Sequence, residues 1–221
     1  MEPLNANPAV FGMVYSDGST DPKAMHEWLN LAVSGGEIAD EFATFGIPSL
    51  LEMPSTGVYT RGVGLDATWE QELEKFASEV VIPRMNNKTA VGVFLGDEIC
   101  CHNSSCWHAQ LYPLSAKLRA LLGTKAILYE NECGDSLAGG GMAHGHPVGP
   151  PLDKVAPDLD FISIDLYKGY LPSDDNGTAE AIAARAFVEK EGERTECFLC
   201  NNRILDDTCR VSSYSWKHRG S

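Results

Sequence analysis

Residues 91–98 read Val-Gly-Val-Phe-Leu-Gly-Asp-Glu, and this stretch decides which fold the sequence predicts. It is apolar up to its last two residues, which is typical of a buried strand in a parallel sheet. Strict alternation places the valines and Leu95 on one face, and both glycines, Phe94 and Glu98 on the other. The β-branched face suits a covering layer of helices, and the glycine-bearing face suits a crowded barrel interior. We therefore expect Glu98 to point inward at the end of the strand, with Asp97 at the rim beside it.

Other short apolar runs and longer helical patterns alternate along the chain. Four further runs predict strands, at residues 9–15, 47–53, 126–129 and 161–167. Helical spacing of apolar residues predicts four helices, at residues 21–33, 68–85, 113–122 and 178–190. The first of these helices begins with Asp21 as its N-cap and Pro22 in its first turn. Gly123 is predicted to end the third helix.

This alternation of strands and helices predicts an α/β fold with a parallel sheet. Strand starts recur about every 35–45 residues, close to the repeat of a (β/α)8 TIM barrel with long loops. We therefore predict a TIM-barrel-like domain over residues 1–191, incomplete, with about five βα units visible. An open, doubly wound sheet is the alternative. The first strand is not followed by a Gly-x-Gly-x-x-Gly motif, which disfavours a nucleotide-binding version of that alternative.

Residues 192–221 differ from the rest of the chain. They hold five basic and four acidic residues and three of the seven cysteines, whereas the preceding residues are strongly acidic. We treat them as a divergent C-terminal tail, for which disorder is one alternative. A closed barrel typically needs about 250 residues. The sequence therefore predicts a truncated or alternatively ended product, lacking one strand at the front and two at the back.

Composition and charge narrow the classes of partner. The 221 residues are 43% hydrophobic, which disfavours intrinsic disorder. Asp and Glu number 31 against 17 Lys and Arg, and the formal net charge of -14 disfavours nucleic acids and anionic membrane surfaces. The chain has no apolar run long enough for a membrane span, and its first residues do not resemble a signal peptide. Oligomeric state is not predicted.

Three glycosylation sequons begin at Asn87, Asn103 and Asn176. They indicate a glycoprotein with a secretory history and are consistent with a secreted or lysosomal protein. Three cysteines and two histidines cluster at Cys100, Cys101, His102, Cys106 and His108. For this cluster a loop disulfide, free thiols and a zinc site all stay open. No metal and no cofactor is assigned.

Carboxylates gather near the ends of four predicted strands. Burying a carboxylate costs free energy, so carboxylates on buried strands call for an explanation. Their presence on four successive strands indicates an acidic cleft. The candidates are Glu52, Asp97, Glu98, Glu130, Glu132 and Asp165. Such a cleft suits glycoside hydrolysis, because one carboxylic acid protonates the leaving oxygen and a second group stabilises or attacks the anomeric carbon. A divalent metal held by Glu52, Glu98, Glu130 and Asp165 is the alternative use.

Aromatic residues near predicted strand ends could stack on sugar faces. We select Trp107 and Tyr167 as candidates for substrate binding. Trp69 and Tyr59 fall in similar positions, and for all of these residues ordinary packing is the competing interpretation.

The strand ending in Asp97-Glu98 resembles the fourth strand of TIM-barrel glycoside hydrolases. Residues 95–99, Leu-Gly-Asp-Glu-Ile, followed by Cys106-Trp107, are similar to the Gly-Gly-Asp-Glu segment of the beta-hexosaminidases. Residues 46–54 resemble the preceding strand of that family. The resemblance implies that Asp97 orients the 2-acetamido group of the substrate and that Glu98 is the general acid/base.

This sequence also departs from the family pattern. The histidine that precedes the two glycines is absent, one of the glycines is missing, and the insert at residues 100–105 is long. Retaining barrel glycosidases of the wider superfamily need a second Glu on the seventh strand. After residue 167 the sequence shows no strand with a terminal Glu.

We therefore expect a glycoside hydrolase-like protein that acts on O-glycosidic bonds of a carbohydrate. One alternative is a non-catalytic or truncated barrel that binds carbohydrate or nothing. A divalent-metal-dependent hydrolase is the other alternative.

Overall fold

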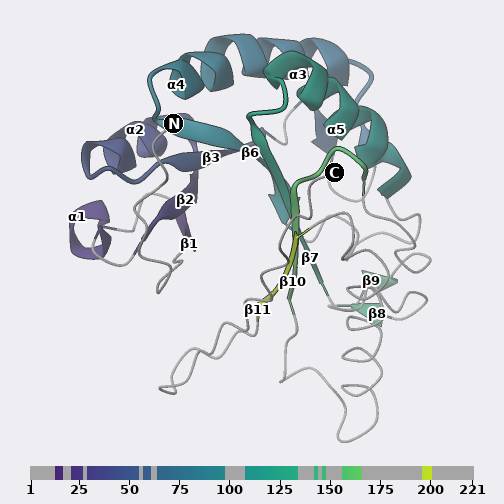
Figure 1. The fold of residues 1–221 in the computed structure, drawn as a ribbon. Helices are drawn as coiled ribbons and strands as arrows, with labels where there is room; N and C mark the ends of the chain where they lie inside the picture. Colours follow the sequence, from purple (N-terminus) through teal and green to yellow (C-terminus); the bar gives the residue numbers. More distant parts are fainter. Residues whose placement is uncertain are drawn as a thin grey trace, which may run out of the picture.

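Seven parallel strands build the central sheet, and their order follows the chain (Figure 1). They are β1 (Met13–Ser16), β2 (Leu31–Ser34), β3 (Ser49–Glu52), β6 (Ala90–Asp97), β7 (Ile127–Cys133), β10 (Phe161–Asp165) and β11 (Glu196–Cys200). The computed structural model describes residues 13–16, 21–26, 29–54, 57–60, 64–97, 108–133, 142–143, 146–147, 156–165 and 196–200. A doubly wound sheet reverses its strand order at a switch point, whereas these strands run in sequence without reversal. The doubly wound alternative is therefore wrong.

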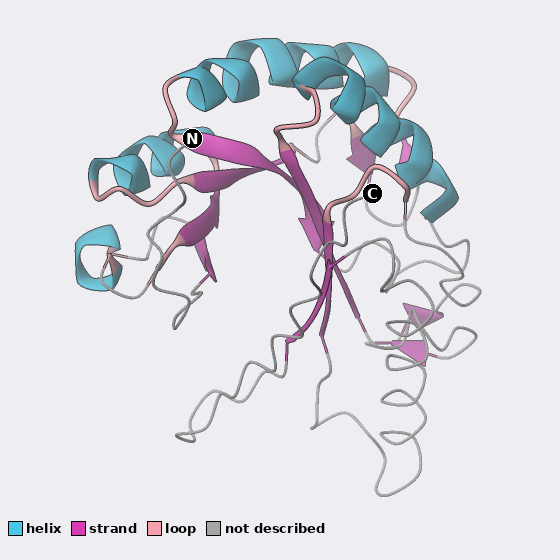
Figure 2. Ribbon diagram, viewed as in Figure 1, coloured by secondary structure: helices cyan, strands magenta, loops and turns pink. Residues whose placement is uncertain are grey.

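The helices cover one side of this curved sheet (Figure 2). They are α1 (Pro22–Met25), α2 (Gly36–Thr44), α3 (Trp69–Phe76), the π-helical turn η1 (Ala77–Val81), α4 (Ile82–Asn86) and α5 (His108–Leu122). Two short antiparallel ribbons lie apart from the sheet, β4 (Tyr59–Thr60) with β5 (Gly64–Leu65), and β8 (Met142–Ala143) with β9 (His146–Pro147). Within the described part of the chain, no helix is long and apolar enough to cross a membrane.

Each face of the sheet has its own apolar cluster. We call the first the helix face, where Leu51, Val93, Leu95, Leu128 and Ile162 pack with residues of α3, η1 and α5. The opposite face, here called the inner face, carries Leu31, Val33, Leu50, Phe94 and Tyr129. The alternation predicted for residues 92–95 and 161–163 agrees with this division, because Phe94 is inner while Val93, Leu95 and Ile162 are on the helix face. Val91 departs from it and packs against the inner cluster, beside a register shift between β3 and β6.

An ion pair connects α5 with α3. Lys117 Nζ on α5 lies 2.5 Å from Glu74 Oε1 and 3.5 Å from Glu70 Oε2, both on α3. The hydrogen bond to Glu74 raises the pKa of the Lys117 ammonium above its usual range.

All five predicted strands are confirmed where the structure describes them (residues 9–12 and 166–167 lie outside the described residues), but the sheet contains two more. The predicted helix at residues 21–33 is wrong beyond its first turn. Asp21 Oδ1 does accept a hydrogen bond from the Lys23 amide at 2.9 Å, as an N-cap should. The helix then stops because residues 31–34 are fully paired between β1 and β3 and buried at every position. Tertiary pairing overrides the helical spacing here.

The other additional strand, β11, lies inside residues 192–221, so the sheet continues into the segment set apart by its charge. Counting from β1, β6 is the fourth strand and β11 is the seventh. The strand that the prediction did not count is β2, and whether a further strand precedes residue 9 stays a prediction. Whether the domain ends at residue 191 stays a prediction.

Among the helices, residues 68–85 are confirmed as the continuous run of α3, η1 and α4. Helix α5 begins at His108, so Pro113 lies inside it instead of opening it. Gly123 ends α5 as predicted, with φ of +76° and its amide donating to the Arg119 carbonyl. The helix predicted at residues 178–190 lies outside the described residues.

Gly92 permits a close approach between β6 and β7. A Cβ at this position would lie 1.9 Å from the Ile127 carbonyl oxygen and 2.6 Å from two further backbone atoms of the same residue. Backbone atoms cannot move aside as a flexible side chain can, so the pairing of these two central strands requires glycine here.

We expect Gly92→Ala to lower the free energy of unfolding by more than about 3 kcal/mol, because the methyl group forces β6 away from β7. Gly35→Ala is the matched control, since its Cβ would have no atom within 4 Å and its φ of -66° suits alanine. Urea denaturation of both variants measures the difference. Equal stabilities would contradict the close approach of the two strands at Gly92.

Candidate functional site

The carboxyl ends of the parallel strands bring acidic residues to one edge of the sheet. Glu52 is the last residue of β3, Asp97 of β6 and Asp165 of β10. Glu52 and Asp97 are both exposed. Glu52 follows the inner-face residue Leu50 by two positions and pairs in register with Phe94, so it belongs to the inner face. This edge is where ligands bind in most parallel α/β folds.

A bulge in β6 decides which face of the sheet Asp97 belongs to. Phe94 pairs with Tyr129, but the next paired residue on β6 is Asp97, which lies opposite Asn131. Two residues of β6 therefore face one residue of β7, and the alternation reverses. Asp97 consequently shares the inner face with Phe94. Unbroken alternation would place Asp97 on the face of Leu95, and the bulge places it on the inner face instead.

Hydrogen bonds connect Asp97 to side chains deeper on the inner face. Asn131 Nδ2 donates to Asp97 Oδ1 at 2.7 Å. The Ser163 hydroxyl donates to Asn131 Oδ1, and the Tyr129 hydroxyl lies 2.6 Å from Ser163 Oγ. We call these four residues the inner-face relay. Tyr129 is also stacked on Phe94, with ring centroids 5.1 Å apart.

Glu130 and Glu132 are placed differently from this group. Both are completely buried. Glu130 pairs in register with Ile162, which belongs to the helix face, and Glu132 follows it by two residues on the same side. The structure therefore does not bring these two carboxylates to the inner face with Glu52 and Asp97.

The metal alternative needs Glu52, Glu98, Glu130 and Asp165 to converge. Glu52 and Glu130 lie on opposite faces of the sheet, so this ligand set is not brought together. Among the described residues, no group of three His, Cys, Asp or Glu side chains is placed to hold a metal ion.

Three predicted site residues, Glu98, Trp107 and Tyr167, lie outside the described residues, and Asp165 is placed by its backbone alone. Trp69 and Tyr59 pack against the apolar cluster of the helix face, which fits a packing role. Sequence reasoning missed Asn131, Ser163 and Tyr129. Their signal is that polar groups alternate along β7 and β10 on the face opposite Leu128 and Ile162.

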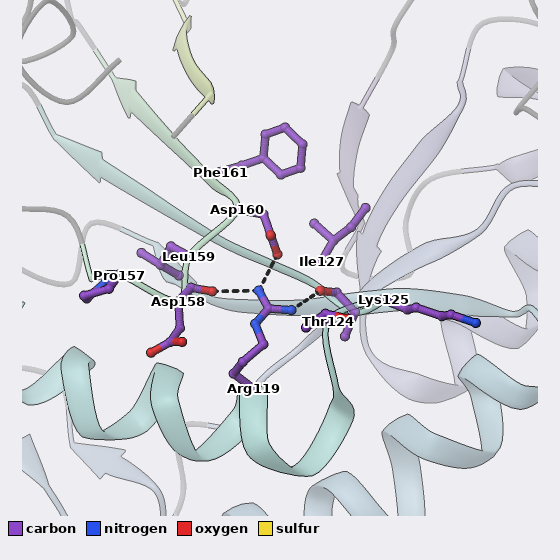
Figure 3. Close-up of a pocket in the computed structure, with 10 residues that line it drawn as sticks. Arg119, Thr124, Lys125, Ile127, Pro157, Asp158, Leu159, Asp160 and Phe161 are labelled. Atoms are coloured by element: carbon purple, nitrogen blue, oxygen red, sulfur yellow. Dashed lines mark hydrogen bonds and ion pairs between the residues drawn. The ribbon is translucent and has the colours of Figure 1, made fainter. Parts of the chain in front are cut away.

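A hollow lies at the other end of the sheet (Figure 3). It has a volume of about 640 Å³ and lies around the starts of β7 and β10. Arg119 projects into it and donates to the carbonyls of Gly123, Ala126 and Asp158. Its guanidinium also pairs with Asp160 Oδ2 at 2.7 Å, and that oxygen accepts from the Leu128 amide.

Because its donors go to backbone carbonyls and one carboxylate, Arg119 ties the end of α5 to the two segments that enter β7 and β10. We therefore assign this hollow a structural role. The chemistry-bearing side chains lie at the opposite ends of the same strands.

The position of the Glu in the seventh strand, β11, decides whether this strand brings a Glu side chain to the edge that carries Glu52 and Asp97. Glu196 is its first residue and Cys200 its last, and Cys200 pairs in register with Asp165. Asn201 and Asn202 follow. Within β11, therefore, the Glu lies at the strand start, away from the edge that carries Glu52 and Asp97.

Comparisons with known proteins agree with this fold. No protein-family model matches the chain, and no curated protein matches it. Among solved structures, the chain is similar to a beta-D-glucuronidase of Dictyoglomus thermophilum, with 13% identity and a TM-score of 0.53. It is also similar to the beta-glucuronidase of Ruminococcus gnavus, with 12% identity and a TM-score of 0.54. A beta-glucuronidase of an uncultured Clostridium species gives 14% identity and a TM-score of 0.52.

These matches cover 85%, 87% and 85% of this chain but 34% of each enzyme, so the chain spans about a third of their length. At such low identity they show a shared fold, an α/β fold with a parallel sheet as found in part of these glycoside hydrolases. They do not support the narrower resemblance to beta-hexosaminidases.

We expect Arg119→Leu to lower the free energy of unfolding by about 2–4 kcal/mol, because it removes the guanidinium that donates to three carbonyls and to the Asp160 carboxylate. Lys125→Ala is the control, since Lys125 borders the same hollow but is exposed. Thermal and urea unfolding compare the two. A loss in both variants, or in neither, would contradict the structural role of Arg119.

Proposed function

We propose that this chain forms a (β/α)-barrel-type domain that binds carbohydrate at the carboxyl ends of its strands and cleaves an O-glycosidic bond. Glu98 is the general acid/base, and Asp97 orients the sugar. The observation that carries the proposal is the carboxylate of Asp97, which faces inward at the end of the fourth strand and is held by Asn131. The fold shared with the beta-glucuronidases supports it.

The chemistry follows from the order of acidic groups at this edge. Glu98, the residue after Asp97, would give its proton to the leaving oxygen as the glycosidic bond breaks. Positive charge then develops at the anomeric carbon, where the Asp97 carboxylate is proposed to stabilise it. Water adds to that carbon, and Glu98, which has given up its proton to the leaving group, takes up the proton that the water releases. Glu52 and Asp165 are proposed to accept hydrogen bonds from sugar hydroxyls. Trp107 and Tyr167 are proposed to stack on the sugar face.

A second candidate function is carbohydrate binding without hydrolysis. A specific observation favours it: the seventh strand ends at Cys200, and its Glu lies at its first residue. Retaining barrel glycosidases use a second carboxylate at the end of their seventh strand as the nucleophile. If no other carboxylate takes this place, the site binds sugar but turns it over slowly or not at all.

We expect Glu98→Gln to lower kcat on an activated aryl glycoside by at least about 10²-fold while leaving the unfolding midpoint unchanged. The substrate panel should contain neutral aryl glycosides together with aryl glucuronides and galacturonides. Glu79→Gln makes the same chemical change at an exposed position on the π-helical turn and is the control.

Unchanged kcat in Glu98→Gln would remove Glu98 from the acid/base role. Glycan binding by the wild type without turnover of any aryl glycoside would favour the second candidate. A glycan array read in parallel with the aryl glycoside panel separates these outcomes.

A further inference from the structure

We infer that Asn131 is a positioning residue, which together with Ser163 and Tyr129 holds the Asp97 carboxylate in a single orientation at the inner face. Its consequence for catalysis rests on the proposed function. The hydrogen-bonded arrangement itself does not, and it can be tested separately.

Only one assignment of donors and acceptors fits all the hydrogen bonds of the inner-face relay. The single proton of the Ser163 hydroxyl goes to Asn131 Oδ1, so the Tyr129 hydroxyl must donate to Ser163 Oγ. The remaining amide group, Nδ2, then donates to Asp97 Oδ1 at 2.7 Å. Turning the amide over would place its oxygen against the carboxylate oxygen, and two acceptors at that distance repel.

Burial makes this direction stable. Tyr129, Asn131 and Ser163 are 6%, 7% and 1% exposed, whereas Asp97 at the end of the relay is exposed. Buried polar groups that satisfy one another specify a single arrangement, because breaking one bond leaves its partner without water. The stacking of Tyr129 on Phe94 fixes the starting point of the relay. An exposed carboxylate, which would otherwise sample several rotamers, is thereby held by a rigid interior.

The bulge makes the relay possible. It brings Asp97 opposite Asn131, two residues along the inner face from Tyr129. Asp97 is the last residue of β6, so fixing its side chain holds a carboxylate in one position at the carboxyl edge of the sheet. Groups oriented before the substrate arrives stabilise the transition state without reorganising.

Two buried serines supply a matched pair of variants. Ser163→Ala removes the hydroxyl that orients the Asn131 amide. Ser34→Ala removes a hydroxyl that is equally buried and hydrogen-bonded, to Ser49 Oγ at 3.2 Å, but on β2 and outside the relay. A purely structural role predicts the same result for both variants. Asn131→Leu, close to asparagine in size, removes the bond to Asp97 directly.

The first measurement is the 13C resonance of the Asp97 side-chain carboxyl in the full chain, assigned by its disappearance in Asp97→Asn. We expect Asn131→Leu and Ser163→Ala to shift this resonance and Ser34→Ala to leave it in place. If the resonance does not move in Ser163→Ala or Asn131→Leu, or moves equally in Ser34→Ala, the inference is overturned. Because Ser163→Ala only shortens a side chain, it keeps the inference testable even if Asn131→Leu fails to fold.

The second measurement is turnover of an aryl glycoside by the same variants. We expect kcat to fall ten- to a hundredfold in Asn131→Leu, on the order of the cost of a misplaced catalytic group, with KM changed little. Ser34→Ala should retain wild-type kcat. Loss of kcat equally in both would overturn the positioning role. Absence of turnover in the wild type, with the carboxyl shifts as expected, would instead count against the proposed hydrolysis and leave the inferred relay standing.

Discussion

The pairing of β6 with β7 is the constraint on which the rest of the structure depends. The two strands meet so closely at Gly92 that a methyl group would strike the backbone of Ile127. Further along, the register slips by one residue between Phe94 and Asp97. Before this slip, Val93 and Leu95 lie on the helix face. After it, Asp97 lies on the inner face. One strand therefore contributes both to the apolar core and to the candidate site.

The two ends of these strands have different roles. At their starts, Arg119 joins the end of α5 to the segments entering β7 and β10 through backbone carbonyls and Asp160. At their ends, the hydrogen bonds of the inner-face relay connect side chains to one another. They lead from the buried Tyr129 to the exposed Asp97. In parallel barrels, residues at the strand starts serve stability and residues at the strand ends serve ligand binding, and the proposed site follows the same division. A rigid base allows the opposite edge to hold a carboxylate in one orientation.

The sequence predicted the strands whose apolar runs stand between clear turn signals, and it missed those defined by their neighbours. Leu31–Ser34 continues a helical pattern and becomes a strand only because β1 and β3 flank it. Glu196–Cys200 contains a charge and two cysteines, so its pairing with β10 was not predictable from periodicity. Alternation correctly places Glu130 and Glu132 on the same face of β7 as Leu128. The sequence does not show that this is the face that the helices cover. The bulge before Asp97 is a property of two strands together, which no single run of residues encodes.

The location of the ligand tests the central claim most directly. Chemical shifts of the backbone amides, followed by NMR while an aryl glycoside is added, report which end of the sheet it contacts. We predict that the largest changes fall at the strand ends around Glu52, Asp97 and Asn131, with little change around Arg119 and Lys125. Changes concentrated at the Arg119 hollow, or no saturable change with any glycoside of the panel, would contradict a carbohydrate site at the carboxyl ends of the strands.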